Sequence, residues 1–157
     1  MTPLARFRKV VVGGTFDRLH LGHQRLLSVA LELGDRVVIG VTTDSFVREE
    51  GKKGVEPFEE RVRAVRRFVE EKGASDRVEI VPLEDRYGTT LEDDEMDAIV
   101  VSPETEPVAL EINELRRKRG FPPLSIVVIP FVLDGDGRKI SSSRLRGEVD
   151  EGPCRDD

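Results

Sequence analysis

The sequence predicts an α/β protein with a Rossmann-like open sheet of five parallel strands and helices on both faces. Two observations support this fold class. Short runs of branched apolar residues alternate with longer stretches whose apolar residues recur at helical spacing, which is the β-α-β order of a parallel sheet. The first run is apolar throughout, as in a strand covered on both faces, and it meets Gly13 and Gly14 before a helix begins.

The five strands are expected where valine and isoleucine are most concentrated. They are Lys9–Val12, Arg36–Val41, Val78–Pro82, Ala98–Val101 and Ser125–Ile129. Each is too short to be a helix of average length and is separated from the next by a helical or polar stretch. Parallel pairing with right-handed crossovers follows from this alternation.

The three helices are expected between these strands, over Gly22–Leu33, Phe58–Lys72 and Glu104–Arg119. The first places its leucines and Ala30 toward the sheet, and the second repeats phenylalanine and valine at helical spacing after Pro57, which fits a first helical position. Glycine ends all three, at Gly34, Gly73 and Gly120.

The remaining segments are expected to be loops. Thr42–Glu56 is a loop or short helix, Leu83–Glu95 an acidic active-site loop, Pro130–Lys139 a loop, and Ile140–Gly147 another strand-to-helix transition. At 157 residues the chain has the size of one domain, expected over residues 1–150, with residues 151–157 as a disordered acidic tail.

Composition narrows the class of protein. The net charge of −6 argues against general nucleic-acid binding, and no apolar stretch approaches the roughly 20 residues of a membrane span. The single cysteine, Cys154, rules out an internal disulfide, so a cytoplasmic protein is expected. Charged residues make up 36%, and Gln24 and Asn113 are the only amide side chains, which indicates a heat-adapted source.

The loop after the first strand carries the strongest functional signal. Glycines followed by a helix start let the backbone approach a phosphate, and the helix N-terminus offers N–H groups to it. This is not the GxGxxG dinucleotide pattern. It contains instead the only two histidines, His20 and His23, three residues apart and therefore on one helical face. They fit phosphate donors; a helix-capping histidine and a metal pair are the alternatives, although no third histidine exists for a metal.

A second candidate phosphate site lies near the end of the chain. Ser141, Ser142 and Ser143 stand at an expected helix start and are flanked by four cations, which are Arg138, Lys139, Arg144 and Arg146. Taken alone, such a run is equally typical of an ordinary helix cap. Together with the first loop, it could clamp one triphosphate at the C-terminal ends of strands one and five.

These two motifs resemble a known superfamily. GTFDRLHLGH and ISSSRLR are similar to the HxGH and ISSxxxR signatures of the nucleotidylyltransferases. Further stretches, among them GKKGVEPFEERV and DAIVVSPET, resemble the phosphopantetheine adenylyltransferases of archaea and of the eukaryotic bifunctional coenzyme A synthase. The resemblance covers nearly the whole chain. It implies transfer of AMP from ATP to 4′-phosphopantetheine, giving dephospho-coenzyme A and pyrophosphate.

The resemblance also implies residue roles. Thr15 and His23 contact the reacting phosphates, His20 and Gly22 shape the ATP site, and Lys52 steadies the phosphopantetheine phosphate and the transition state. Ser141, Ser142 and Ser143 match the β/γ-phosphate loop, with Arg144 and Arg146 nearby. Gly14, Phe16, Ser102 and Thr105 are further expected nucleotide contacts. Without the resemblance, Lys52 and Lys53 are solvated loop charges.

One segment departs from the bacterial enzymes. They carry an arginine-containing RGxR after the fourth strand, where this chain has Val101-Ser102-Pro103-Glu104-Thr105. The missing arginine is either replaced, by Arg144 or Arg146, or not needed.

The chemistry implied needs no general base, because the attacking phosphate oxygen is already ionised at neutral pH. Catalysis reduces to alignment and charge stabilisation, with Mg²⁺ entering with ATP and no metal ligands from the protein. Two alternatives stay open. One is the same chemistry on another phosphorylated substrate, such as NMN, FMN or glycerol phosphate, with ATP or CTP. The other is a non-catalytic nucleotide sensor. Coenzyme A is a further possible ligand.

Overall fold

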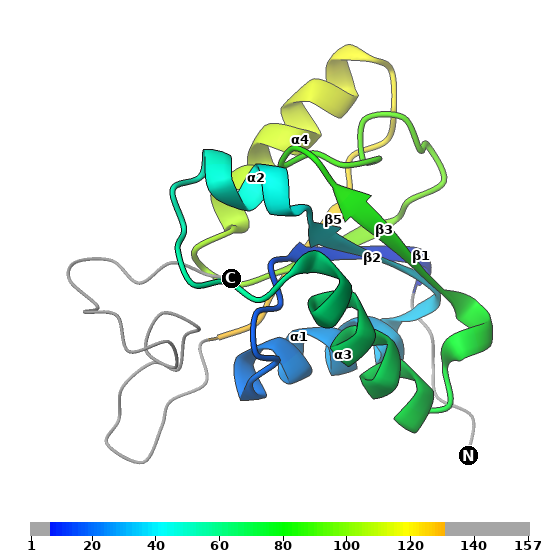
Figure 1. Cartoon of the computed structure of the whole chain (residues 1–157). Helices are drawn as coiled ribbons and strands as arrows, with labels where there is room; N and C mark the ends of the chain where they lie inside the picture. Colours follow the sequence, from blue (N-terminus) through cyan, green and yellow to red (C-terminus); the bar gives the residue numbers. More distant parts are fainter. Residues whose placement is uncertain (1–6, 131–157) are drawn as a thin grey trace.

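The five strands form one sheet in which every neighbouring pair is parallel. The computed structural model describes residues 7–130; residues 1–6 and 131–157 lie outside the described part. The strands are β1 (Phe7–Gly14), β2 (Gly34–Thr42), β3 (Val78–Leu83), β4 (Ala98–Val101) and β5 (Ser125–Val128). They lie in the order β3-β2-β1-β4-β5. The predicted open parallel sheet is confirmed (Figure 1).

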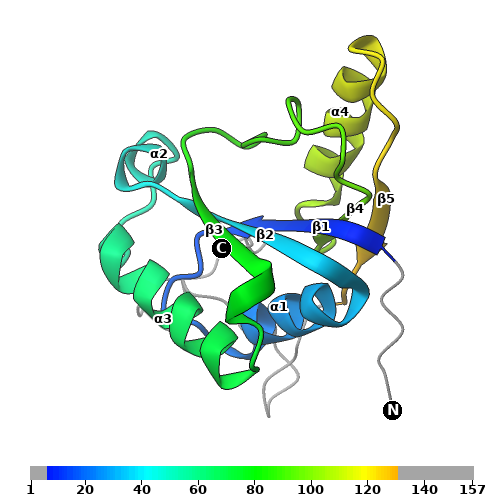
Figure 2. The same cartoon turned by 90° about the vertical axis from the view of Figure 1, so that its right-hand side faces the viewer.

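Helices cover both faces of this sheet, as predicted. The helices are α1 (Leu21–Leu33), α2 (Asp44–Glu49), α3 (Phe58–Glu71) and α4 (Glu106–Lys118), with a 3₁₀ turn, η1, at Ser75–Arg77. Figure 2 shows α1 and α3 below the sheet and α4 above it. Alternation along the strands explains the two cores: in β1, Val10 and Val12 face α1 and α3, whereas Val11 faces α4.

The expectation of a loop or short helix over Thr42–Glu56 is confirmed, since this segment contains the short helix α2, capped by the hydroxyl of Thr43. Two helix starts differ from the sequence-based expectation. Pro57 is the N-cap of α3 and not its first helical residue. The fourth helix begins at Glu106 instead of Glu104, because Ser102 and Thr105 close a turn in which the Thr105 N–H donates to the Ser102 carbonyl.

The order of the strands in the sheet indicates where a ligand would bind. From β1, the chain crosses to β2 on one side, and later returns to β4 on the other side. In open α/β sheets, ligands bind where the order reverses, beyond the carboxyl ends of the strands. Here that position lies between Gly14, the last residue of β1, and Val101, the last residue of β4.

Candidate active site

The loop from β1 to α1 is held in an unusual backbone conformation. Phe16 and Arg18 both have positive φ, 55° and 51°, a region that side chains other than glycine rarely occupy. Asp17 is fully buried and holds the loop: its carboxylate accepts from the Glu56 N–H at 2.9 Å and from the Arg18 guanidinium at 2.8 Å. Backbone strain kept by such contacts is typical of functional loops.

The two histidines stack at the start of α1. Their ring centroids are 3.8 Å apart with an interplanar angle of 19°, and His23 also meets Phe16 edge-on at 5.4 Å. Nδ1 of His20 accepts from the Gly22 N–H at 3.0 Å, and Nδ1 of His23 accepts from the His20 N–H at 3.3 Å. A ring nitrogen that accepts carries no proton, so each neutral imidazole presents Nε2–H as a donor.

His20 therefore has the helix-capping role that the sequence left as an alternative. It is the N-cap of α1, and with His23 it forms a reciprocal capping box. The cap uses only Nδ1, so it remains compatible with a donor role for Nε2. A side chain at Gly22 would come within 2.9 Å of the His20 ring, which explains the glycine between the histidines.

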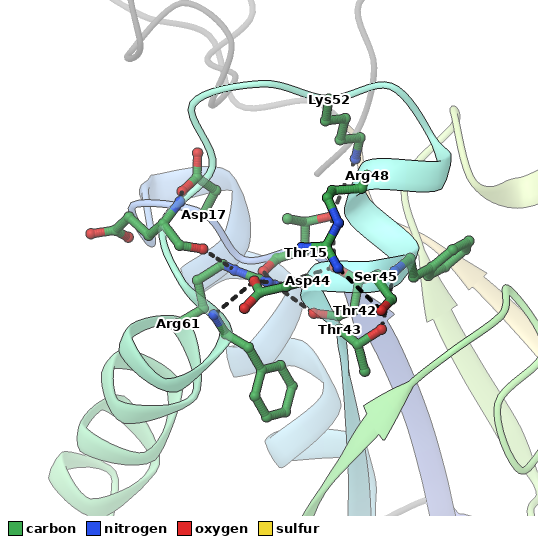
Figure 3. Close-up of polar contacts among 12 residues, drawn as sticks. Thr15, Asp17, Thr42, Thr43, Asp44, Ser45, Arg48, Lys52 and Arg61 are labelled. Carbon is green, nitrogen blue, oxygen red and sulfur yellow. Dashed lines mark hydrogen bonds and ion pairs between the residues drawn. The ribbon is translucent and has the colours of Figure 1, made fainter.

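Lys52 reaches the loop after β1, whereas Lys53 is exposed. The Lys52 ammonium donates to Oγ1 of Thr15 at 3.1 Å, and it lies 3.7 Å from the Glu50 carboxylate. Its side chain is only 12% exposed. The structure thus brings together Thr15 and the one lysine that the resemblance selects (Figure 3).

A buried arginine that the sequence analysis did not select lies under this pair. Arg61 of α3 is fully buried, and its Nη1 donates to the carbonyl oxygens of Thr15 at 3.0 Å and Thr42 at 2.7 Å. It also donates to the Glu56 carbonyl at 2.7 Å and to the Asp44 carboxylate at 3.0 Å. One guanidinium therefore joins the segments after β1 and β2 to the start of α3 (Figure 3).

The segment after β4 is closed on itself by local hydrogen bonds. The Ser102 N–H donates to the Thr105 hydroxyl at 3.0 Å, and the two hydroxyl oxygens lie 3.3 Å apart. Thr105 is the N-cap of α4. These two predicted nucleotide contacts are thus at the carboxyl end of β4, beside the switch point of the sheet.

A cleft opens on the α4 face of the sheet, with Thr15 and Lys52 in its wall. Its volume is about 890 Å³, including the open mouth. Most of the wall is apolar, with Val11, Val38, Val81, Leu83, Ile99 and Ile112 among its residues. A mostly apolar pocket with a few convergent polar groups is typical of a small-molecule site.

A hydrogen bond, the Tyr87–Glu111 bridge, links the loop after β3 to α4 at one side of the cleft. The Tyr87 hydroxyl donates to the Glu111 carboxylate at 2.7 Å, and Arg86 lies 3.5 Å from the same carboxylate. The hydrogen bond to Glu111 raises the pKa of the Tyr87 phenol above its usual range. The predicted active-site loop thus contributes a wall to the cleft.

A second buried arginine secures that loop. Arg116 of α4 is fully buried and donates to the backbone carbonyls of Thr90 at 2.6 Å, Asp93 at 2.8 Å and Pro122 at 2.9 Å. Burial lowers the pKa of the Arg116 guanidinium. Arg61 and Arg116 both occupy apolar-face positions of their helices, and that spacing is the signal that could have identified them in the sequence.

Several predicted site residues share this end of the sheet, and others cannot be placed. The described ones are Gly14, Thr15, Phe16, His20, Gly22, His23, Lys52, Ser102 and Thr105. The second phosphate motif, Ser141, Ser142, Ser143, Arg144 and Arg146, lies outside the described residues. Within residues 7–130, no three His, Cys, Asp or Glu side chains form a metal-binding group. No helix in that part of the chain has the length and apolar character that a membrane crossing requires.

The chain was compared with known proteins. A family model described as cytidylyltransferase-like matches residues 11–148. The phosphopantetheine adenylyltransferase of Methanothermobacter thermautotrophicus is 48% identical over 146 residues, covering 92% of this chain and 87% of the relative. That of Pyrococcus horikoshii is 44% identical, covering 91% of this chain and 90% of the relative.

Solved structures agree in fold. A protein of unknown function from Archaeoglobus fulgidus is 42% identical, with a TM-score of 0.70, covering 77% of this chain and 88% of that chain. A lipopolysaccharide core biosynthesis protein from Thermoplasma volcanium is 29% identical, with a TM-score of 0.62, covering 78% and 95%. On the extent of the family match and on these identities, the chain belongs to the cytidylyltransferase-like family, in the branch whose members are named phosphopantetheine adenylyltransferases.

Proposed function

We propose that this enzyme transfers AMP from ATP to 4′-phosphopantetheine, giving dephospho-coenzyme A and pyrophosphate. The observation that carries the reaction is the 48% identity to a phosphopantetheine adenylyltransferase along 92% of this chain. The geometry of the site supports it, because a buried threonine and a largely buried lysine meet at the carboxyl end of β1, in the wall of a mostly apolar cleft.

The reaction is an in-line displacement at phosphorus. An ionised oxygen of the acceptor phosphate forms a bond to the α-phosphorus of ATP, and the bridging oxygen to the β-phosphorus leaves with the electron pair as pyrophosphate. The nucleophile needs no deprotonation, so the protein has to align two phosphates and stabilise the charge that develops between them.

The site offers donors for that charge. Lys52 supplies a cation and Thr15 a hydroxyl in the wall of the cleft, and the two imidazoles stack at the start of α1, with Nδ1 of each used in the capping box. We assign His23, Lys52 and Thr15 to the reacting phosphates, and His20 and Gly22 to the shape of the ATP site. Gly14, Phe16, Ser102 and Thr105 complete the assignment among the described residues. Preorganised donors of this kind lower the barrier most where water is excluded.

Five further residues of the proposed site lie outside residues 7–130. Ser141, Ser142, Ser143, Arg144 and Arg146 are assigned to the β- and γ-phosphates. The described residues provide no carboxylate cage, so Mg²⁺ is expected to arrive on the phosphates of ATP.

The apolar cleft is assigned to the acceptor. The pantetheine arm is a chain of amides and methylenes, which matches a mostly apolar wall closed at one side by the Tyr87–Glu111 bridge. Coenzyme A shares this arm and is a candidate second ligand of the same cleft. The composition and charge favour a cytoplasmic enzyme that binds neither nucleic acid nor membranes.

One assay tests the reaction and its alternatives together. The purified protein is incubated with Mg²⁺ and either ATP or CTP, with 4′-phosphopantetheine, NMN, FMN or glycerol 3-phosphate in separate reactions, and pyrophosphate release is measured. Release with ATP and 4′-phosphopantetheine alone is expected. Release with another pair would reassign the substrate, and ATP binding without release in any reaction would support the nucleotide sensor.

A further inference from the structure

The Thr15 hydroxyl accepts hydrogen bonds from two sides: from Thr42, which is itself bound by Arg61, and from Lys52. Arg61 Nη1 donates to Oγ1 of Thr42 at 3.2 Å, Thr42 Oγ1 donates to Oγ1 of Thr15 at 3.2 Å, and Lys52 Nζ donates to the same Thr15 oxygen at 3.1 Å. Figure 3 shows these residues converging from α3, from the end of β2 and from the loop after α2.

Guanidinium and ammonium groups only donate, so the Thr42 hydroxyl accepts from Arg61 and the Thr15 hydroxyl accepts from Lys52. Between the two hydroxyls, Thr42 is the donor and Thr15 is the acceptor. The Thr15 oxygen accepts two bonds, which uses both of its lone pairs, and its own proton remains to be donated elsewhere.

Burial makes this arrangement rigid. Arg61 is fully buried, Thr15 is 2% exposed and Thr42 is 5% exposed, so water competes little for these hydrogen bonds. Arg61 is also held by the carbonyl oxygens of Thr15 and Thr42, which fixes its Nη1 beside the Thr42 hydroxyl. No acceptor among the described residues contacts the Thr15 proton, and Thr15 lines the cleft.

We propose that Arg61 and Thr42 are positioning residues that orient the Thr15 hydroxyl as a donor toward a phosphate oxygen in the cleft. A phosphate oxygen only accepts, so a hydroxyl that turned a lone pair toward it would repel it. Thr42, itself held by Arg61, occupies one lone pair of the Thr15 hydroxyl and Lys52 occupies the other, which removes that orientation. This inference rests on the proposed adenylyl transfer as the function of the site.

The test removes only the hydroxyl of Thr42, which connects Arg61 to Thr15. Thr42→Val keeps the branched shape and both carbonyl contacts of Arg61, and kcat is expected to fall about tenfold, the loss equivalent to one hydrogen bond. Thr42→Ser keeps a hydroxyl and should return kcat to within about twofold of the unmodified enzyme, which a purely steric role of Thr42 would not produce.

A double-mutant cycle shows whether Thr42 acts through Thr15. In a Thr15→Val background, Thr42→Val should lower kcat by less than about twofold further, because the hydroxyl that it orients is gone. Equal losses in the two backgrounds, or no rescue by Thr42→Ser, would overturn the proposal.

Thr43→Val is the matched control for the structural cost. Thr43 directly follows Thr42, is not among the residues that line the cleft, and uses its hydroxyl to accept from the Phe46 N–H at 3.1 Å. Thermal unfolding should show similar destabilisation in Thr43→Val and Thr42→Val. A kcat loss in Thr43→Val as large as that in Thr42→Val would overturn the positioning role of Thr42.

The activity of the unmodified enzyme tests the proposed function separately. If another acceptor supports release, the same cycle is measured with that acceptor. If none does, the variants are compared by ATP affinity, where the same pattern of loss, rescue by serine and non-additivity is expected. If this pattern is absent from the ATP affinities, the positioning role of Arg61 and Thr42 is overturned, whichever substrate the enzyme uses.

Discussion

Lys52 and Lys53 are adjacent in sequence, but their surroundings differ enough to separate their roles. Lys52 is 12% exposed and donates to Thr15, whereas Lys53 is exposed. Lys52→Ala is expected to lower kcat about a hundredfold, because it removes a charged donor from the reacting phosphates. Lys53→Ala, the matched control, should stay within about twofold, since an exposed charge is screened by solvent. Steady-state rates of pyrophosphate release measure both. Equal rates in the two variants would contradict the assignment of Lys52.

His23 is fully buried between the rings of His20 and Phe16, so its position is fixed before substrate arrives. His23→Ala is expected to lower kcat about a hundredfold, as loss of a preorganised donor does, with the KM for ATP changed much less. Rates at saturating ATP and 4′-phosphopantetheine, with thermal unfolding as a check on folding, measure this. A near-normal kcat would exclude His23 from the transition state.

Prediction of site residues from the sequence succeeded for residues that belong to a motif and failed for a residue whose role depends on burial. Thr15, His20, His23 and Lys52 were selected by the paired motifs and lie at the same end of the sheet. Arg61 was not, because an arginine on an amphipathic helix is usually solvated. Its spacing with the apolar residues of α3 was the available signal, and its contacts with carbonyls from distant segments show that it is buried.

At the level of elements, the N-terminus of α1 combines a structural and a chemical role in one side chain. His20 caps the helix through Nδ1, and its other nitrogen is the one assigned to the ATP site. His20→Ala is expected to reduce the free energy of unfolding by about 1 kcal/mol, the typical value of an N-cap, and to lower the rate as well. His20→Asn restores a good cap without an imidazole.

The comparison of the two variants separates the roles. His20→Asn should regain most of the stability lost in His20→Ala, measured by chemical denaturation, while its rate of pyrophosphate release stays low. If the rate recovers together with stability, His20 serves the enzyme as a helix cap alone.

Element order and type could be predicted because hydrophobic periodicity and glycine signals agreed along the chain. β4 was predicted with its observed bounds, and the three long helices were predicted within two residues at each end. The start of α4 was wrong because side chains compete with helix formation there: the Ser102–Thr105 turn delays the helix to Glu106. The short helix that the sequence allowed within Thr42–Glu56 is α2, capped by Thr43.

At the scale of the whole molecule, the cleft is a product of topology that no local pattern encodes. Its wall contains residues from each of the strands β1, β2, β3 and β4, from α2 and α4, and from the loop after β3. The apolar residues of that wall have the same sequence signature as core residues, since each strand contributes alternate side chains to either face. The parallel pairing, by contrast, was implied by the β-α-β alternation, and the strand order that the structure adds locates the cleft at the switch point.

One leucine in the wall of the cleft packs closely against two glycines. Leu83, which ends β3, lies over Gly40 of β2, where an added Cβ would come within 2.7 Å of the leucine Cγ and Cδ2. A Cβ at Gly88 would be 2.5 Å from Leu83 Cδ2. Gly40→Ala therefore has to displace the side chain of Leu83, which lines the cleft.

The effect of this substitution should be confined to binding of the acceptor, 4′-phosphopantetheine. Gly40→Ala is expected to raise the KM for 4′-phosphopantetheine about fivefold, an effect of the size expected for one misplaced apolar group, while the KM for ATP stays within about twofold. Shortening the displaced side chain in the same protein, Gly40→Ala with Leu83→Val, should lower the acceptor KM again, because it returns the lost space. Initial rates with each substrate varied in turn measure both constants. If the two constants rise together, or if the second substitution gives no recovery, the arm of the acceptor does not lie against Leu83, and the cleft serves another part of the reaction.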